Sequence, residues 1–202
     1  MDKISSPKVP VEEILPIKPD EIQAIIDHCP AKTYMGDRDI AIMCLLLDTG
    51  ARAEEFLNMN IADYNVRDGD ILIRKGKGSK PRHVFVGLGS RKALRNWLKH
   101  RKDTCDAMWI NNKGTRLEYG GLRGIIKRRG KNANVKASSI HDFRRSFAIN
   151  FLRANPGEIM SLQKLMGHAD LQILRRYLAQ TTEDLKEAHM RGSPVDNFLH
   201  IR

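Results

Sequence analysis

The sequence predicts an α+β domain that is mainly α-helical and contains one small antiparallel β-sheet. Apolar residues recur at helical spacing in most segments, and two short neighbouring segments, 70–74 and 82–86, have the pattern of strands. The chain has 202 residues, of which 41% are hydrophobic, and this is enough for one substantial core. These observations predict a single domain over residues 19–190.

The first part of the chain is predicted to be an extended lead-in followed by three helices. Residues 1–18 are rich in Pro, Lys and Val, as in a linker from a preceding domain. A helix should begin at Pro19, where acidic residues in the first turn suit the helix dipole. A second helix over 37–49 is apolar on all sides and should be buried, and Gly50 can end it in the left-handed conformation. A short helix follows over 51–57.

The middle of the chain contains the predicted sheet. Strands 70–74 and 82–86 are joined by 75–80, where two glycines permit a tight turn. The pattern then predicts a helix over about 88–103, a short strand around 108–110 and a further helix with a basic last turn.

The last third is predicted to be helical. The expected helices run from Ser138-Ser139 to about 154, from about 158 to 166, through Tyr177, and over about 182–190. The tail, 191–202, is too short to bury its own apolar residues. It therefore either packs back on the domain or docks on a neighbouring protomer.

The charge of the chain predicts a polyanionic partner. Lys and Arg number 35 against 24 Asp and Glu, a formal charge of +11, and nucleic acid is the commonest polyanion. A basic surface that serves solubility alone is the alternative. The candidate DNA contacts are Arg145, Lys80, Lys127, Arg128 and Arg129.

The cysteines and the hydropathy pattern predict a cytoplasmic protein. Cys29, Cys44 and Cys105 are odd in number and widely spaced, so they indicate neither a disulfide framework nor a zinc site. No run of about 18 apolar residues is present, and the N-terminus lacks the apolar core of a signal peptide. No membrane partner is expected.

A Gly-His pair stands nine residues before a tyrosine in the last third of the chain. Tyr177 follows His168 and is preceded by two arginines, as a presented phenol beside a phosphate-binding histidine would be. The alternative is structural. Leu171, Leu174 and Leu178 form an apolar stripe, and Tyr177 could lie beside it as a half-buried aromatic.

Partners for a tyrosine nucleophile occur elsewhere in the chain. Two arginines can clamp the non-bridging oxygens of a phosphodiester, a lysine can protonate the leaving oxygen, and a histidine can accept the phenol proton. Cations and a base are required because the free phenol has a pKa near 10. The candidate catalytic residues are Arg52, Lys77, His141, Arg144, His168 and Tyr177. For Lys77 the alternative is a solvated turn lysine. No Asp/Glu cluster has metal-binding spacing, so neither a metal nor another cofactor is expected.

Five sequence elements in order resemble the tyrosine recombinases, or phage integrases, and are most similar to the Xer and integrase branch. They are Thr49-Gly50-Ala51-Arg52-Ala53-Glu54-Glu55-Phe56, Gly76-Lys77-Gly78-Ser79-Lys80, His141-Asp142-Phe143-Arg144-Arg145, Leu165-Met166-Gly167-His168, and Tyr177. They look like the first arginine box, the turn with the catalytic lysine, the His-x-x-Arg box, the Leu-Gly-His segment and the nucleophile. The resemblance covers about residues 10–190 and implies the fold of the DNA breaking-rejoining catalytic domains.

The resemblance also implies the reaction. Tyr177 would attack the scissile DNA phosphate, giving a 3′-phosphotyrosine and a free 5′-hydroxyl. Arg52 and Arg144 would bind the phosphate and Lys77 would be the general acid. The two histidines, at 141 and 168, would hydrogen-bond the phosphate and assist proton transfer. Neither ATP nor metal would be needed.

Two departures from the family pattern modify these expectations. Arg145 stands where many members have histidine, so a phosphate contact or a structural pair is expected for it. Members usually carry an upstream core-binding domain. The present chain is therefore expected to be either a separated catalytic domain or a small catalytic-domain-only member such as a DNA invertase, with weak, salt-dependent DNA affinity.

The implied partners are double-stranded DNA and further copies of the chain. Strand exchange in the family takes four protomers on two DNA sites, and the protein free of DNA is expected to be a monomer. Accessory DNA-bending proteins and a location at the nucleoid are further expectations. Three rival functions remain at this stage: relaxation by a type IB topoisomerase, regulation by a catalytically silent DNA-binding protein, and a basic structural protein with coincidental motifs.

Overall fold

The computed structural model describes residues 16–74, 81–135, 139–167, 186 and 189–198. The chain divides into two compact units, Met1–Ala169 and Asp170–Arg202. Among the described residues, no helix combines the length and the apolar character needed to cross a membrane.

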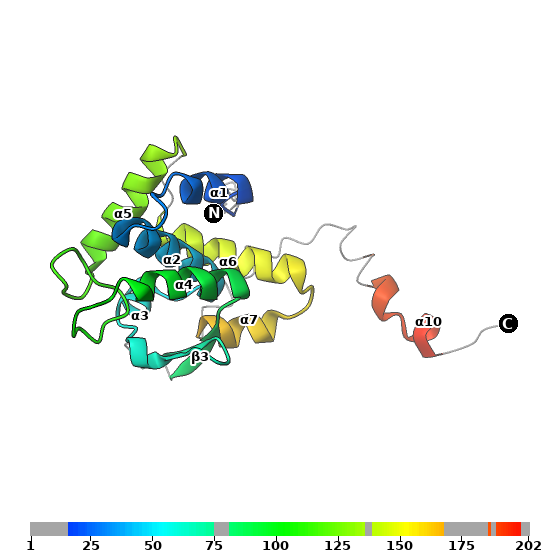
Figure 1. The fold of residues 1–202 in the computed structure, drawn as a ribbon. Helices are drawn as coiled ribbons and strands as arrows, with labels where there is room; N and C mark the ends of the chain where they lie inside the picture. The colour runs from blue at the N-terminus through cyan, green and yellow to red at the C-terminus, as the bar shows by residue number, and fades with distance from the viewer. Residues whose placement is uncertain (1–15, 75–80, 136–138, 168–185, 187–188, 199–202) are drawn as a thin grey trace, which may run out of the picture. The chain divides into compact units, whose positions relative to one another are not determined.

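Where the first unit is described, it is mainly helical with one three-stranded sheet, which confirms the predicted fold class (Figure 1). Its elements are α1 (Pro19–Asp27), α2 (Tyr34–Thr49), α3 (Ala53–Leu57), the 3-10 helix η1 (Ile61–Asp63), β1 (Tyr64–Asn65), β2 (Asp70–Ile73), β3 (Arg82–Phe85), α4 (Leu88–Lys99), α5 (Tyr119–Asn132), α6 (Ile140–Ala154) and α7 (Ile159–Met166).

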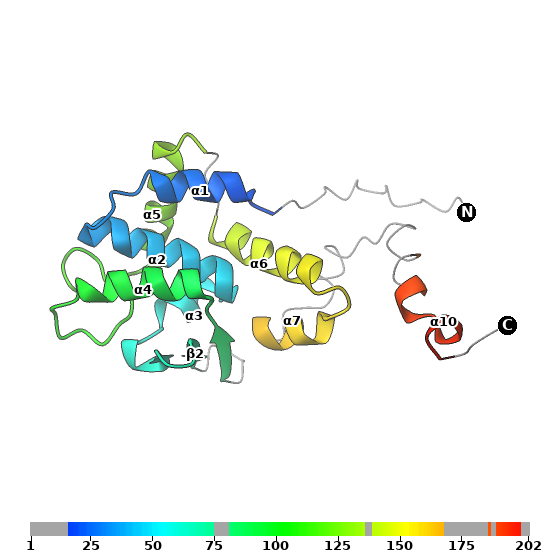
Figure 2. The same ribbon diagram turned by 45° about the vertical axis from the view of Figure 1, so that its right-hand side comes forward.

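Helix α2 is the buried helix that the sequence predicts. The Thr33 hydroxyl caps its start by accepting from the Gly36 amide at 3.1 Å. It packs against both α4 and α6 (Figure 2). It ends at Gly50, whose left-handed conformation (φ 55°) directs the chain into α3.

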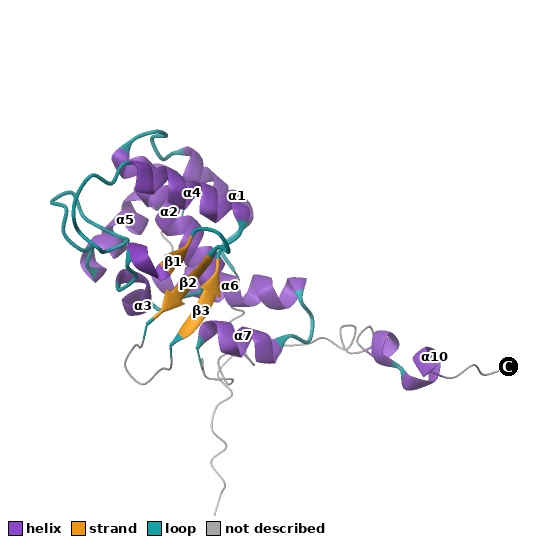
Figure 3. Ribbon diagram, turned by 60° about the horizontal axis from the view of Figure 1, so that its bottom comes forward, coloured by secondary structure: helices purple, strands orange, loops and turns teal. Residues whose placement is uncertain are grey.

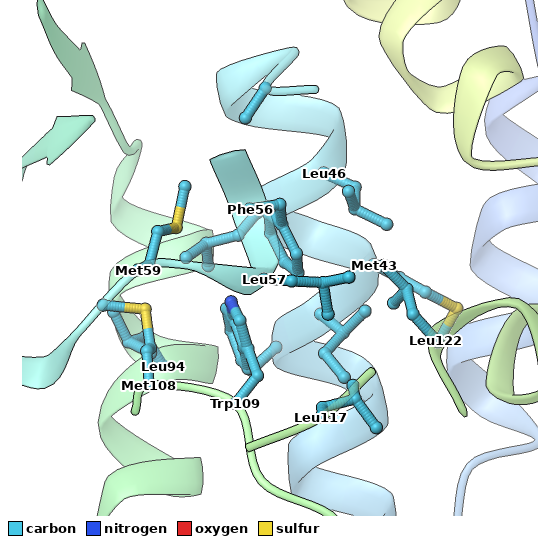
Figure 4. Packing of buried hydrophobic residues seen from close by; sticks show 14 of the residues in the cluster. Met43, Leu46, Phe56, Leu57, Met59, Leu94, Met108, Trp109, Leu117 and Leu122 are labelled. Atoms are coloured by element: carbon cyan, nitrogen blue, oxygen red, sulfur yellow. The ribbon is translucent and has the colours of Figure 1, made fainter. Parts of the chain in front are cut away.

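The core gathers around two tryptophans. Trp109 stacks on Phe56 of α3 with ring centroids 4.8 Å apart (Figure 4). The indole of Trp97 in α4 donates to the carbonyl oxygen of Met108 at 3.0 Å. Because Phe56 is fully buried, it anchors α3 and so fixes the backbone on which Arg52 stands.

The sheet has the order β1-β2-β3 and is antiparallel throughout (Figure 3). Strands β2 and β3 confirm the predicted hairpin, whereas β1 is only two residues long and has no pattern in the sequence. Ile71 lies opposite Val84, and Ile73 lies opposite Arg82. Directly opposed residues share a face, so Arg82 stands on the same face as three buried aliphatic side chains.

Two predicted elements differ from the structure. Helix α4 ends at Lys99, short of residue 103, because the chain folds back and the Arg101 guanidinium donates to the carbonyl oxygens of Cys105 and Ala107 at 2.6 and 2.7 Å. The segment around 108–110 is not a strand. Isolated bridges, Asn60 with Ala107 and Ile110 with Arg116, hold it instead.

In the second unit, the described residues include one short helix, α10 (Pro194–Phe198). This helix lies within the segment that the sequence predicts to be a tail. The predicted helix over 182–190 lies mostly outside the described residues.

Candidate active site

Arg52 stands at the N-terminal cap of α3 and is oriented by Glu55, one turn into the helix. The backbone amide of Arg52 donates to Oε2 of Glu55 at 2.9 Å, and its Nη1 donates to Oε1 at 2.9 Å. Both ends of the residue are therefore bound to one carboxylate. The Arg52 side chain is nevertheless 42% exposed, which leaves it accessible to an anion.

Arg144 projects from the second turn of α6. Ser139 caps this helix by accepting from the Asp142 amide and donating its own amide to the Asp142 carboxylate at 2.7 Å. The Arg144 guanidinium donates to the carbonyl oxygen of Gly50 and, at 3.1 Å, to that of Met166. His141 lies one turn earlier and is exposed. The spacing of three residues puts His141 and Arg144 on one side of α6.

The two arginines meet at the end of α7. Arg144 reaches the carbonyl oxygen of Met166, and Nη2 of Arg52 reaches that of the next residue, Gly167, at 2.9 Å. These carbonyls are the acceptors that a helix leaves unpaired at its C-terminus. The chain turns at Gly167 in the left-handed conformation (φ 67°), and His168 is the next residue in the sequence. Segments far apart in the chain thus bring both predicted phosphate ligands to one place.

A third arginine, which the sequence analysis did not single out, completes this group. Nε of Arg82 donates to the carbonyl oxygen of Leu165 at 2.8 Å, while Nη1 and Nη2 grip the two oxygens of Glu55 at 2.9 and 2.8 Å. A signal was available, because Arg82 alternates with Val84 and Val86 and so occupies an inward position of its strand.

Glu55 is ionised in this setting. Burial by itself raises the pKa of its carboxyl, but hydrogen bonds from Arg82 and Arg52 outweigh that effect and lower the pKa to about 2. We call Arg52, Glu55, Arg82 and Arg144 the arginine cluster. Arg52 and Arg82 bind the carboxylate, whereas Arg144 binds carbonyl oxygens beside them. Three guanidinium groups with one carboxylate give the cluster excess positive charge, as a phosphate-binding site requires.

Four predicted site residues, Lys77, Lys80, His168 and Tyr177, lie outside the described residues. The strands that flank the lysine turn are described: Ile73 at the end of β2 pairs with Arg82 at the start of β3.

The basic end of α5 separates into exposed and buried side chains. Lys127 is exposed, and Arg128 is half-exposed, 3.3 Å from the Asp39 carboxylate. The Arg129 guanidinium is buried and pairs with Asp39 at 2.8 Å. Arg129 is therefore not retained as a DNA contact, because the fold already uses its charge. Arg145 is exposed and pairs with Asp142 at 3.3 Å.

The sequence profile of the phage integrase family matches residues 16–184. The chain belongs to the phage integrase family. This confirms the resemblance stated from the five sequence elements.

Named relatives of this phage integrase family chain are tyrosine recombinases. XerC of Myxococcus xanthus is 34% identical over 95% of this chain and 66% of its own length, and XerA of Pyrococcus furiosus is 28% identical over 98% and 68%. Among solved structures, XerH bound to its difH substrate before cleavage aligns with a TM-score of 0.71 and 25% identity, over 92% of this chain and 56% of XerH. The chain thus spans about two thirds or less of each of these proteins.

Proposed function

We propose that this chain is the part of a tyrosine-type site-specific recombinase that cleaves and rejoins DNA. The observation that carries the proposal is the convergence of Arg52 and Arg144 on the adjacent carbonyls of Met166 and Gly167, directly before His168. Two guanidinium groups at one point suit the two non-bridging oxygens of a phosphodiester. The relatives are named as recombinases, which favours strand exchange over topoisomerase-like relaxation or a silent regulator.

In the proposed reaction, the phenol oxygen of Tyr177 forms a bond to the scissile phosphorus while the bond from phosphorus to the 5′ oxygen breaks. The phenol proton passes to a histidine, and Lys77 supplies a proton to the departing 5′ oxygen. Arg52 and Arg144 stabilise the charge on the five-coordinate phosphorus. The energy of the broken bond is kept in the 3′-phosphotyrosine, so the reverse steps rejoin DNA.

We propose double-stranded DNA as the partner, with Lys80, Lys127, Arg128 and Arg145 as backbone contacts. The XerH structure contains its difH DNA, and the exposed positions of Lys127 and Arg145 fit such contacts. Assembly of four protomers on two DNA sites, with the C-terminal segment as a contact between neighbours, is part of the same proposal.

Covalent trapping tests the proposal. Nicked DNA duplexes with a randomised sequence around the nick are incubated with the chain. Cleavage next to the nick releases a short strand, so rejoining is prevented and adduct accumulates. We expect a detergent-resistant protein–DNA adduct with wild type and none with Tyr177→Phe. An adduct that persists in the phenylalanine variant would contradict the assignment of the nucleophile, and no adduct with any duplex would contradict the recombinase proposal for this chain.

A further inference from the structure

Arg82 occupies a position where its charge needs an internal partner. It stands opposite Ile73 on the face of the sheet that also presents Ile71 and Val84, all of which are buried. Its side chain is only 9% exposed. A guanidinium on a buried face is costly unless its donors are satisfied and its charge is paired.

The partners of Arg82 connect three elements. Nη1 and Nη2 of Arg82 donate to the two carboxylate oxygens of Glu55 in α3, and its Nε donates to the Leu165 carbonyl oxygen in the last turn of α7. Helix α7 lies beside β3 (Figure 3). The bidentate geometry fixes the plane of the carboxylate as well as its position.

Glu55 passes this constraint to Arg52. Oε1 of Glu55 accepts from Nη1 of Arg82 and from Nη1 of Arg52, each at 2.9 Å. Nη2 of Arg52 donates to the Gly167 carbonyl oxygen. The direction of the Arg52 guanidinium is consequently set by a carboxylate that Arg82 holds and by a turn that packs on Arg82.

We propose that Arg82 is a positioning residue for the transesterification, holding Glu55 and the end of α7 so that Arg52 faces the phosphate. This inference rests on the proposed function. Arg82 itself does not touch the reacting atoms. Its loss should therefore reduce the rate of cleavage on bound DNA more than it reduces affinity for DNA.

The experiment compares Arg82→Gln and Arg82→Lys with wild type, with Arg52→Gln and with a matched control, Arg91→Gln. Arg91 in α4 also pins backbone carbonyls, those of Val66 and Arg67 at 2.8 and 2.9 Å, but lies outside the arginine cluster. The rate of adduct formation is measured at saturating DNA on two substrates. The first is a nicked duplex that formed an adduct in the trapping experiment, and the second is the same duplex with a methylphosphonate at the scissile position. The methyl group removes the negative charge that Arg52 stabilises.

We expect Arg82→Gln to slow cleavage of the ordinary phosphate by ~10- to 100-fold, since small misplacements of a catalytic group have effects of that size. In Arg82→Gln, the ratio of the cleavage rate on phosphate to the cleavage rate on methylphosphonate should fall toward the ratio measured for Arg52→Gln. Arg82→Lys should recover only part of the loss, because an ammonium cannot reproduce the fork. A wild-type ratio in folded Arg82→Gln, or the same loss in Arg91→Gln, would overturn the inference. If Arg82→Gln does not fold, Arg82→Lys decides by the same ratio.

Hydrogen exchange of the segment 159–167 without DNA keeps this inference separate from the proposed function. Exchange should accelerate in Arg82→Gln or Arg82→Lys and stay unchanged in Arg91→Gln. If wild type forms no adduct but exchange accelerates in the variants at position 82, the recombinase proposal fails while the conclusion that Arg82 stabilises the end of α7 is supported. Unchanged exchange in both variants at position 82 would contradict the conclusion that Arg82 stabilises the end of α7.

Discussion

A Cβ atom placed on Gly167 would lie 2.7 Å from Nη1 of Arg82, so these two residues are packed too closely for a side chain at position 167. Gly167 also adopts a positive φ of 67°. The contact joins the residue before His168 to the arginine that grips Glu55. A side chain at position 167 would therefore displace the Arg82 guanidinium as well as strain its own backbone.

Gly167→Ala should weaken the fold and slow cleavage. The left-handed conformation costs an alanine about 1–2 kcal/mol, and displacing Arg82 adds to that loss of unfolding free energy. Urea unfolding and adduct formation measure the two effects. Gly124→Ala in α5 is the control, since nothing lies within 4 Å of its added Cβ, and it should stabilise by roughly 0.5–1 kcal/mol. A Gly167→Ala protein as stable and active as wild type would contradict this account.

The stability of the fold should depend on Glu55 at acidic pH. Its pKa is lowered from 4.5 to about 2, so its ionised form stabilises the folded protein above pH 4.5, and this contribution is lost as the pH falls from 4.5 through 2. The contribution at neutral pH is on the order of 3 kcal/mol. Unfolding measured across this range should show a shallower pH dependence in Glu55→Gln. Glu54→Gln removes an exposed neighbouring carboxylate and should leave the dependence unchanged; equal slopes in all three proteins would refute the expectation.

The two kinds of basic residue on α5 should separate by salt dependence. Lys127→Gln should reduce the magnitude of the slope of log K against log salt for DNA binding by about 0.9, with no loss of stability. Arg129→Gln should leave that slope unchanged and lower the free energy of unfolding by about 1.5–3 kcal/mol, because Asp39 would lose a buried charged hydrogen bond while keeping its pairs with Arg38 and Arg128. A smaller salt slope in Arg129→Gln, with its unfolding free energy unchanged, would show that Arg129 contacts DNA.

Removal of 191–202 should weaken assembly on DNA while leaving the first unit folded. This segment contains α10, and Val195 on that helix is 43% exposed, so it is available to a neighbouring protomer. Sedimentation on DNA that carries two sites measures assembly, and thermal unfolding measures the fold. Val195→Asp in the full-length chain is the finer test. Unchanged assembly in both would exclude this segment as a contact between protomers.

Local patterns in the sequence were sufficient for the elements that depend on their own residues. The apolar centre of α2, the glycine that ends it and the strands β2 and β3 could be predicted because periodicity and backbone conformation are local properties. The spacing of His141 and Arg144 likewise places them on one side of a single helix. Strand β1 could not be predicted because its two residues are too few to show an alternating pattern. The end of α4 could not be predicted because it depends on which carbonyl oxygens the Arg101 side chain reaches, and periodicity does not record that contact.

The sequence by itself determined the family, the fold class and the residue types for phosphodiester chemistry, because these depend on ordered motifs and local periodicity. Tertiary structure alone decided which charges are available. Arg129 is paired with Asp39 of α2, and Arg82 is paired with Glu55 of α3. Only the folded chain brings Arg52 and Arg144 to the end of α7. Charge pairing in a buried setting depends on partners distant in sequence, and periodicity does not record them.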